Sequence, residues 1–180
     1  MTKNKKPLIL IGIVALIILI IGWLMSGYND MVKLDENVNR EWSQVENQYQ
    51  RRLDLIPNLV NVVKGYASHE KETLEGVIEA RTKATQTTID PSNMTEEQLA
   101  NFQKSQDGLS GALNRLMVVV EKYPDLKAID NFKQLQDQLE GTENRITVAR
   151  KDYNKAVTIY NKKVRSFPNN MLAGIFGFSV

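Results

Sequence analysis

The chain has 180 residues, of which 42% are hydrophobic and 24% charged, a balance typical of a folded protein rather than a disordered one. It contains no cysteine, which excludes disulfides, a thiol nucleophile and thiolate metal ligands. Without the three lysines among its first six residues, the 23 basic residues fall to 20 against 21 acidic ones, so the remainder is close to neutral and we expect no nucleic-acid binding.

The first 25 residues predict a membrane anchor. An uncharged apolar run extends from Leu8 to Met25, and at about 1.5 Å per helical residue it spans roughly 27 Å, close to the hydrocarbon thickness of a bilayer. Trp23 stands near its end, where its ring would favour the membrane interface. A cleaved signal peptide is the alternative, but the run is longer than a usual signal core and no small-x-small cleavage site follows. We therefore predict a retained single-pass transmembrane helix over residues 8–25.

The charges beside this helix predict its orientation. Lys3, Lys5 and Lys6 precede the span, and positive residues favour the cytoplasmic side. Residues 1–7 are then a short cytoplasmic segment, and residues 28–167 form an extracytoplasmic domain. Lys33 and Arg40 follow on the other side and weaken this signal.

A first long helix is predicted from near Tyr28 to beyond Lys64, because apolar residues recur three or four positions apart. Asp35 and Arg52 interrupt this apolar stripe. The stripe consists of Met31, Val38, Trp42, Val45, Tyr49, Ile56, Leu59, Val63 and Tyr66.

Pro57 stands inside that pattern. In a helix it removes one backbone hydrogen bond and its ring presses on the carbonyl of Leu53, so the chain either bends or starts a new helix there. The stripe keeps its phase from Tyr49 through Ile56 to Val63, which favours one kinked helix over two separate ones. Whether Pro57 kinks or splits the helix is not decided by this pattern.

Two breaks separate the remaining predicted helices. A shorter helix is expected from His69 to Thr85, with Ser68 as its cap and Ile78 among its inward residues, followed by a loop over residues 85–94. Thr95 and Gln98 fit a capping box that opens a third helix to about Lys122. The second break is the segment YPDLKAID, residues 123–130.

The last long helix is predicted from Asn131 to Arg165, since aromatic and aliphatic residues recur every seven positions. This heptad stripe consists of Phe132, Leu139, Ile146, Tyr153, Tyr160 and Phe167. Residues 168–180 form an apolar tail, which we expect to fold back on the bundle rather than to lie on a membrane or a partner. The predicted fold is all-α: one N-terminal transmembrane helix, then an elongated antiparallel bundle of long helices, read as a coiled coil.

The sequence offers no recognisable catalytic, cofactor or metal site. His69 is its only histidine, and no phosphate-binding glycine loop occurs. Two polar groups are candidates for interaction or for fixing the register between helices. The first is Asp54, Asn58 and Asn61 around Pro57, and the second is Asn154 and Asn161, each beside a tyrosine of the heptad stripe.

Four segments carry a resemblance to a known family. They are RRLDLIPNLVNVVKGYASHE, VIEAR, ENRITVARKDYNKAVTIYN and RSFPNNMLAGIFGF, and together they resemble the LemA family over nearly the whole chain. The resemblance implies a bacterial protein of the cytoplasmic membrane with a short inner end, one membrane helix and an extracytoplasmic helical domain. It brings no catalytic residues to this sequence.

Three functions remain open. The first is a membrane-anchored, non-catalytic scaffold that recruits another cell-envelope protein. The second is an envelope enzyme or ligand-binding protein that uses the polar zone around Pro57. The third is a self-assembling coiled coil that remodels membranes, for which the chain would form a homo-oligomer. We favour the first, with the lipid bilayer and an envelope protein as partners.

Overall fold

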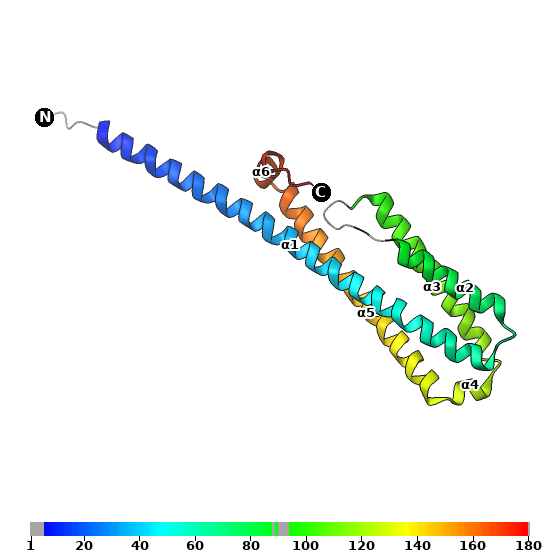
Figure 1. Cartoon of the computed structure of the whole chain (residues 1–180). Coiled ribbons are helices and arrows are strands. Elements are labelled where there is room, and N and C mark those ends of the chain that lie inside the picture. The colour runs from blue at the N-terminus through cyan, green and yellow to red at the C-terminus, as the bar shows by residue number, and fades with distance from the viewer. Residues whose placement is uncertain (1–5, 88, 90–93, 180) are drawn as a thin grey trace. The chain divides into compact units, whose positions relative to one another are not determined.

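The computed structural model describes residues 6–87, 89 and 94–179, and within these residues it contains helices, turns and loops but no strand (Figure 1). The prediction of an all-α fold is therefore confirmed. The helices are α1 Lys6–Tyr66, α2 Lys71–Gln86, α3 Glu96–Val120, α4 Pro124–Ala128, α5 Asp130–Arg165 and α6 Asn169–Phe176.

The chain divides into two compact units. Unit 1 consists of Met1–Glu41 and Asp152–Val180, and unit 2 consists of Trp42–Lys151. Each unit takes part of α1 and part of α5, because both helices continue past a unit boundary. The domain borders predicted from the sequence stay predictions. Residues 1–5 of the predicted cytoplasmic segment, part of the predicted loop over residues 85–94, and Val180 of the tail lie outside the described residues.

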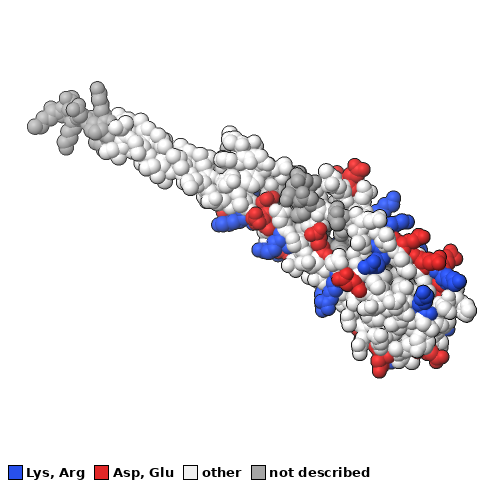
Figure 2. Space-filling view, in the orientation of Figure 1, with Lys and Arg blue, Asp and Glu red and all other residues white. Residues whose placement is uncertain are grey.

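Helix α1 begins with a segment that is long and apolar enough to cross a membrane. Its most apolar stretch of eighteen residues has a mean hydropathy of 2.9, and none of that stretch is buried by the protein. Trp23 and Met25 are exposed, and Leu8 lies within the same helix. Figure 2 shows this segment free of charged side chains, whereas both signs of charge mix over the rest of the face shown. The apolar segment and the first long helix, which we predicted as separate pieces, are thus parts of one helix of 61 residues.

Pro57 lies inside α1 without ending it. The proline itself is exposed, while Ile56 and Leu59 beside it are buried in the core of unit 2. Burial of these flanking residues offsets the cost of the lost hydrogen bond and keeps the helix in phase. The continuity of the helix is confirmed, and the bend itself stays a prediction.

Unit 2 is a helical bundle with a large apolar core. The core receives buried side chains from α1, α2, α3, α4 and the first turns of α5. Of the predicted inward residues, Tyr66 and Ile78 are about half exposed, so their assignment to the core was wrong. The most deeply buried core residues include Ile56, Leu59, Val63, Val77, Leu109, Leu116, Leu126 and Phe132.

The helix ends of unit 2 match the prediction at the start of α3 and differ from it at the start of α2 and at α4. The capping box of α3 is present: the Thr95 hydroxyl accepts from the Gln98 amide at 3.2 Å, and the Gln98 side chain accepts from the Thr95 amide at 2.9 Å. The predicted Ser68 cap is wrong, because α2 starts two residues later than expected and Glu70 precedes it without a side-chain cap. The second break contains the short helix α4, which starts at Pro124, a residue suited to a first helical turn.

In unit 1 the C-terminal tail folds back. Leu172 and Ala173 of α6 are buried against Met31 of α1 and against Tyr160 and Val164 of α5. The expected folding back of the tail is confirmed for this face of α6. Phe167, which we predicted at an inward heptad position, is instead 80% exposed, because α5 ends at Arg165 and the chain turns there.

Asp35 gives unit 1 a testable pH dependence. Burial, and secondarily the charge of Glu36, raises the pKa of Asp35 above its ordinary value of 3.8. Since the pKa of Asp35 is higher in the folded state than in the unfolded state, ionisation of Asp35 opposes folding. The stabilisation contributed by protonated Asp35 is fully present only below about pH 3.8 and is lost as the pH rises through the folded-state pKa. The variant Asp35→Asn is expected to unfold at a higher temperature than the parent at neutral pH.

Thermal unfolding of the detergent-solubilised chain, followed by circular dichroism across a pH series, checks this expectation. The advantage of Asp35→Asn should shrink as the pH falls through the folded-state pKa and vanish when Asp35 is protonated in both states. Asp152→Asn serves as the control, since Asp152 is exposed in unit 1 and its charge is not a cause of the Asp35 shift. An equal gain at all pH values would contradict the assignment.

Candidate functional site: a pocket beside a buried arginine

Arg52 of α1 is the most unusual residue of unit 2, because its side chain is only 1% exposed. It stands between Tyr49 and Ile56, at a position of the apolar stripe where an apolar residue is expected. A guanidinium is strongly hydrated in the unfolded chain, so its burial is costly unless the protein supplies a counter-charge and hydrogen-bond acceptors.

The surrounding helices supply both to the two terminal nitrogens of Arg52, while its buried Nε has no hydrogen-bond partner among the described residues. The Nη1 atom of Arg52 lies 2.9 Å from a carboxylate oxygen of Glu143 on α5 and donates to the Ser110 hydroxyl of α3 at 2.9 Å. The Nη2 atom donates to the side-chain oxygen of Gln106 at 2.5 Å and to its backbone carbonyl at 3.3 Å. Arg52 therefore connects α1, α3 and α5 through polar contacts inside an otherwise apolar core.

The ring of Tyr49 completes the arginine site. The guanidinium carbon lies 5.1 Å from the ring centroid, within the range of a cation–π contact. Burial raises the pKa of Tyr49, and the positive charges of Arg150 and Arg52 partly oppose that shift. The phenol is therefore neutral at physiological pH, and the positive charge of Arg52 faces one carboxylate, that of Glu143.

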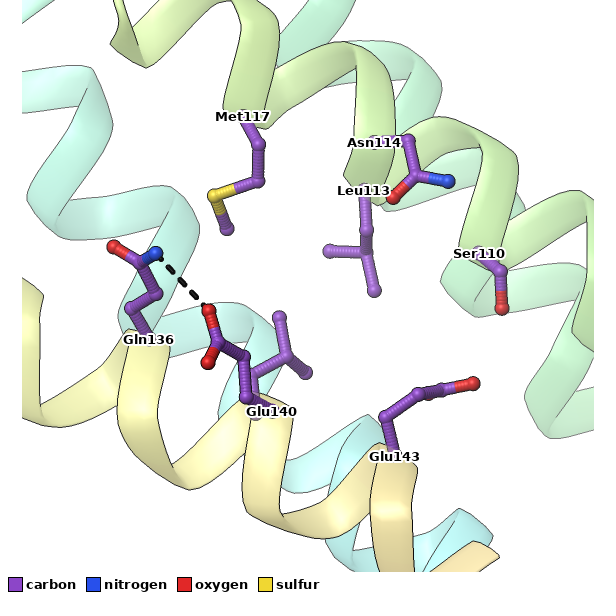
Figure 3. Close-up of a pocket in the computed structure, with 8 residues that line it drawn as sticks. Ser110, Leu113, Asn114, Met117, Gln136, Glu140 and Glu143 are labelled. Atoms are coloured by element: carbon purple, nitrogen blue, oxygen red, sulfur yellow. Dashed lines mark hydrogen bonds between the residues drawn. The ribbon is translucent and has the colours of Figure 1, made fainter. Parts of the chain in front are cut away.

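Glu143 also faces a pocket on the surface of unit 2. Its side chain is 52% exposed although it holds a guanidinium that is fully buried. The pocket has a volume of about 310 Å³ and lies between α3 and α5, whose side chains face each other across it (Figure 3). It is lined by Ser110, Leu113, Asn114, Met117, Gln136, Leu139, Glu140 and Glu143.

The lining combines an apolar floor with acidic and amide groups. Leu113, Met117 and Leu139 supply the apolar part, and Gln136 donates to the Glu140 carboxylate at 3.2 Å. Glu140 has no cation among the residues that line the pocket, while Glu143 is paired with Arg52. Such a surface suits a long side chain with an apolar stem and a positive end, such as lysine or arginine.

The residues predicted from the sequence lie elsewhere. Asp54, Asn58 and Asn61 are all exposed on α1, and the Asp54 carboxylate accepts from Gln50 at 2.8 Å. Asn154 is exposed and Asn161 half-buried on the part of α5 that belongs to unit 1. None of the five lines the pocket beside Arg52. Their role in interaction or register stays a prediction.

In the sequence, Arg52 is recognisable only as an interruption of the apolar stripe. The signal that marks it is its position: the apolar period places it toward the core, so its charge requires a buried partner. The partner was not identifiable, because Glu143 lies 91 positions away and stands among several other acidic residues of α5.

Within the described part of the chain, no group of three or more histidine, aspartate or glutamate side chains is placed to hold a metal ion.

Comparison with known proteins gives a consistent set of relatives. The family model described as the LemA family matches residues 41–180. Magnetosome protein MamQ 2 of Paramagnetospirillum magneticum is 30% identical over 179 residues, covering 90% of this chain and 66% of the relative. Magnetosome protein MamQ of Magnetospirillum gryphiswaldense is 27% identical, covering 99% and 72%. Protein LemA of Metamycoplasma hominis is 27% identical, covering 81% and 63%. The chain thus spans about two thirds of the length of these curated relatives.

Proposed function

Because this chain belongs to the LemA family, as the match over residues 41–180 shows, we propose that it is a membrane-anchored, non-catalytic helical scaffold of the bacterial cell envelope. Its apolar segment over residues 8–25 holds it in the cytoplasmic membrane with the N-terminus inside. Unit 2 then lies outside the cytoplasm, where it binds another envelope protein through the pocket between α3 and α5.

The anchor is supported by the exposure of the apolar segment. The core helix of a soluble protein would bury such a segment, whereas here none of the most apolar stretch is buried. A signal sequence has the same composition, but this segment continues without a break into a helix that supplies core residues to unit 2. The orientation is supported by Lys3, Lys5 and Lys6 before the span.

The observation that carries the partner-binding role is the exposed carboxylate pair of the pocket above an apolar floor. The buried guanidinium of Arg52 lies 2.9 Å from the Glu143 carboxylate and holds it in the pocket lining. The pocket lining contains no cation that would neutralise Glu140. A basic side chain of a partner protein would bury its stem on Leu113 and Met117 and place its charge near Glu140.

Photocrosslinking in cells tests this role. A photoreactive amino acid at Asn114, an exposed residue of the pocket lining, is expected to give a discrete adduct with one envelope protein. The matched control places the same group at Glu97, which is exposed on the same helix but does not line the pocket. Absence of an adduct at Asn114, or the same adducts at both positions, would contradict the proposal. An adduct between two copies of the chain would support self-assembly instead.

Charge reversal at the pocket sharpens the test. The variant Glu140→Lys should reduce the Asn114 adduct about tenfold or more, since a like charge facing a basic partner group costs on the order of 1.4 kcal/mol or more. Asp137→Lys is the control, because Asp137 is exposed on the same helix and outside the pocket lining. Adduct yields are compared by immunoblotting at equal expression. Equal loss in both variants would show a general charge effect rather than recognition at the pocket.

A further inference from the structure

Helix α6 carries apolar side chains on two opposite faces, and only one of them is covered. Leu172 and Ala173 are buried within unit 1. Met171 and Ile175, four positions apart on α6, are 61% and 74% exposed, and Phe167 in the turn before the helix is 80% exposed. We call these three residues the α6 stripe. Folding back of the tail therefore leaves a second apolar surface without a partner in the chain.

The position of α6 on α1 indicates what covers the stripe. Its buried residues Leu172 and Ala173 share an apolar cluster with Met31, and Leu24 of the apolar segment over residues 8–25 packs against that cluster. A Cβ atom added at Gly27 would lie 2.9 Å from Leu172, so this glycine allows α6 to approach α1 closely. Helix α6 thus lies at the level where the proposed membrane span ends.

Aromatic contacts fix α6 at the same level. The ring of Tyr28 lies 5.0 Å from that of Phe176 and 5.6 Å from that of Phe178, in edge-to-face arrangements. Tyrosine and phenylalanine favour the boundary between the acyl chains and the headgroups.

The charges around α6 have the pattern of an interfacial helix. Residues 166–180 contain no charged side chain, whereas the last turn of α5 before them contains Lys162, Lys163 and Arg165. Lys163 pairs with Asp30 at 3.1 Å, and Lys162 and Arg165 are exposed. Basic residues beside an apolar helix face attract anionic phospholipid headgroups while the apolar face enters the acyl boundary.

We propose that α6 is an interfacial helix, with the α6 stripe inserted into the outer surface of the bilayer that α1 crosses. A bilayer that surrounds residues 8–25 ends beside Leu24, at the level of the cluster that contains Leu172 and Ala173 of α6. This inference rests on the proposed membrane anchor and is independent of the proposed partner at the pocket.

The absence of cysteine makes the proposal directly testable. The full-length variant Ile175→Cys is labelled with an environment-sensitive fluorophore and reconstituted in vesicles of equal parts phosphatidylcholine and phosphatidylglycerol. The label is expected to be quenched by a spin-labelled lipid whose nitroxide lies just below the headgroups. It should also be several-fold less accessible to aqueous iodide than the same label in Thr158→Cys, an exposed position of α5 in unit 1.

The outcomes separate this inference from the proposed function. Met171→Cys serves as a second labelling position of the stripe, and circular dichroism confirms that both variants are as helical as the parent. Flotation of the chain with the vesicles reports the anchor, and failure to float contradicts the proposed function. If the chain floats but the label at position 175 is as accessible to iodide as the label at position 158, only the α6 proposal is overturned. The proposal would also be overturned if the label quenched itself increasingly at higher protein density and was not quenched by the lipid nitroxide. That result would show that a second copy of the chain covers the α6 stripe.

Discussion

Replacing Leu16 and Ile20 together by lysine is expected to release the chain from the membrane fraction. Both residues lie near the middle of the predicted span, and their side chains are 57% and 47% exposed, so the substitutions disturb no packing within the chain. Each exchange of an apolar residue for lysine at the centre of a span costs about 3–4 kcal/mol of insertion free energy, and the pair costs roughly twice that. A cost of this size exceeds what a single marginal anchor withstands.

Alkaline extraction of membranes followed by immunoblotting measures the effect. The parent chain should remain in the pellet, and the double lysine variant should move to the supernatant. The control is the double variant Leu16→Val and Ile20→Val, which keeps the span apolar and should behave as the parent. Retention of the lysine variant in the pellet would show that another part of the chain holds it to the membrane.

The second large effect is expected at Glu143. Substitution by alanine removes the carboxylate 2.9 Å from the guanidinium of Arg52 and leaves that charge buried without a counter-ion. Loss of one partner of a fully buried pair costs about 3–5 kcal/mol, and we expect about 2–3 kcal/mol here because water reaches the half-exposed side of the site. Unit 2 should therefore be markedly less stable in Glu143→Ala.

A double-mutant cycle isolates the pair. In an Arg52→Met background the buried charge is gone and Glu143 is only a half-exposed carboxylate, so Glu143→Ala should cost less than about 0.5 kcal/mol. Urea unfolding is followed by fluorescence of Trp42, whose ring packs at 5.5 Å against Phe102 inside unit 2, in a Trp23→Phe background that removes the signal of the anchor. Equal costs of Glu143→Ala in both backgrounds would contradict the role assigned to the pair.

Most of the helical architecture of this chain could be predicted from its sequence, because the helices follow local rules. The heptad spacing placed the start of α5 within one residue and its end at Arg165, and the capping box placed the start of α3. The phase across Pro57 favoured one helix over two, because apolar residues on both sides of the proline pack into the same core. Helix α4 was missed because five residues provide too little periodicity to recognise.

The candidate site was predictable only in part. An arginine at a core position signals a buried partner, but which acidic residue meets it depends on how α1, α3 and α5 pack, and spacing along the chain carries no such information. The asparagines beside the tyrosines of α5 recur with the helical period, as expected. Consecutive residues of a helix point in directions about 100° apart, however, so a residue next to a core position can face the solvent. Asn154 is exposed for this reason.

The central claim is that α1 remains in the membrane as an anchor and holds unit 2 outside the cytoplasm. Labelling of the variant Asn114→Cys in intact cells with a membrane-impermeant maleimide tests it most directly, with Thr2→Cys as the matched position before the span. We predict that the label reaches position 114 in intact cells and position 2 only after permeabilisation, in both cases on an unprocessed chain of the membrane pellet. Labelling of position 2 but not position 114 in intact cells, or recovery of a shortened soluble chain, would contradict the account.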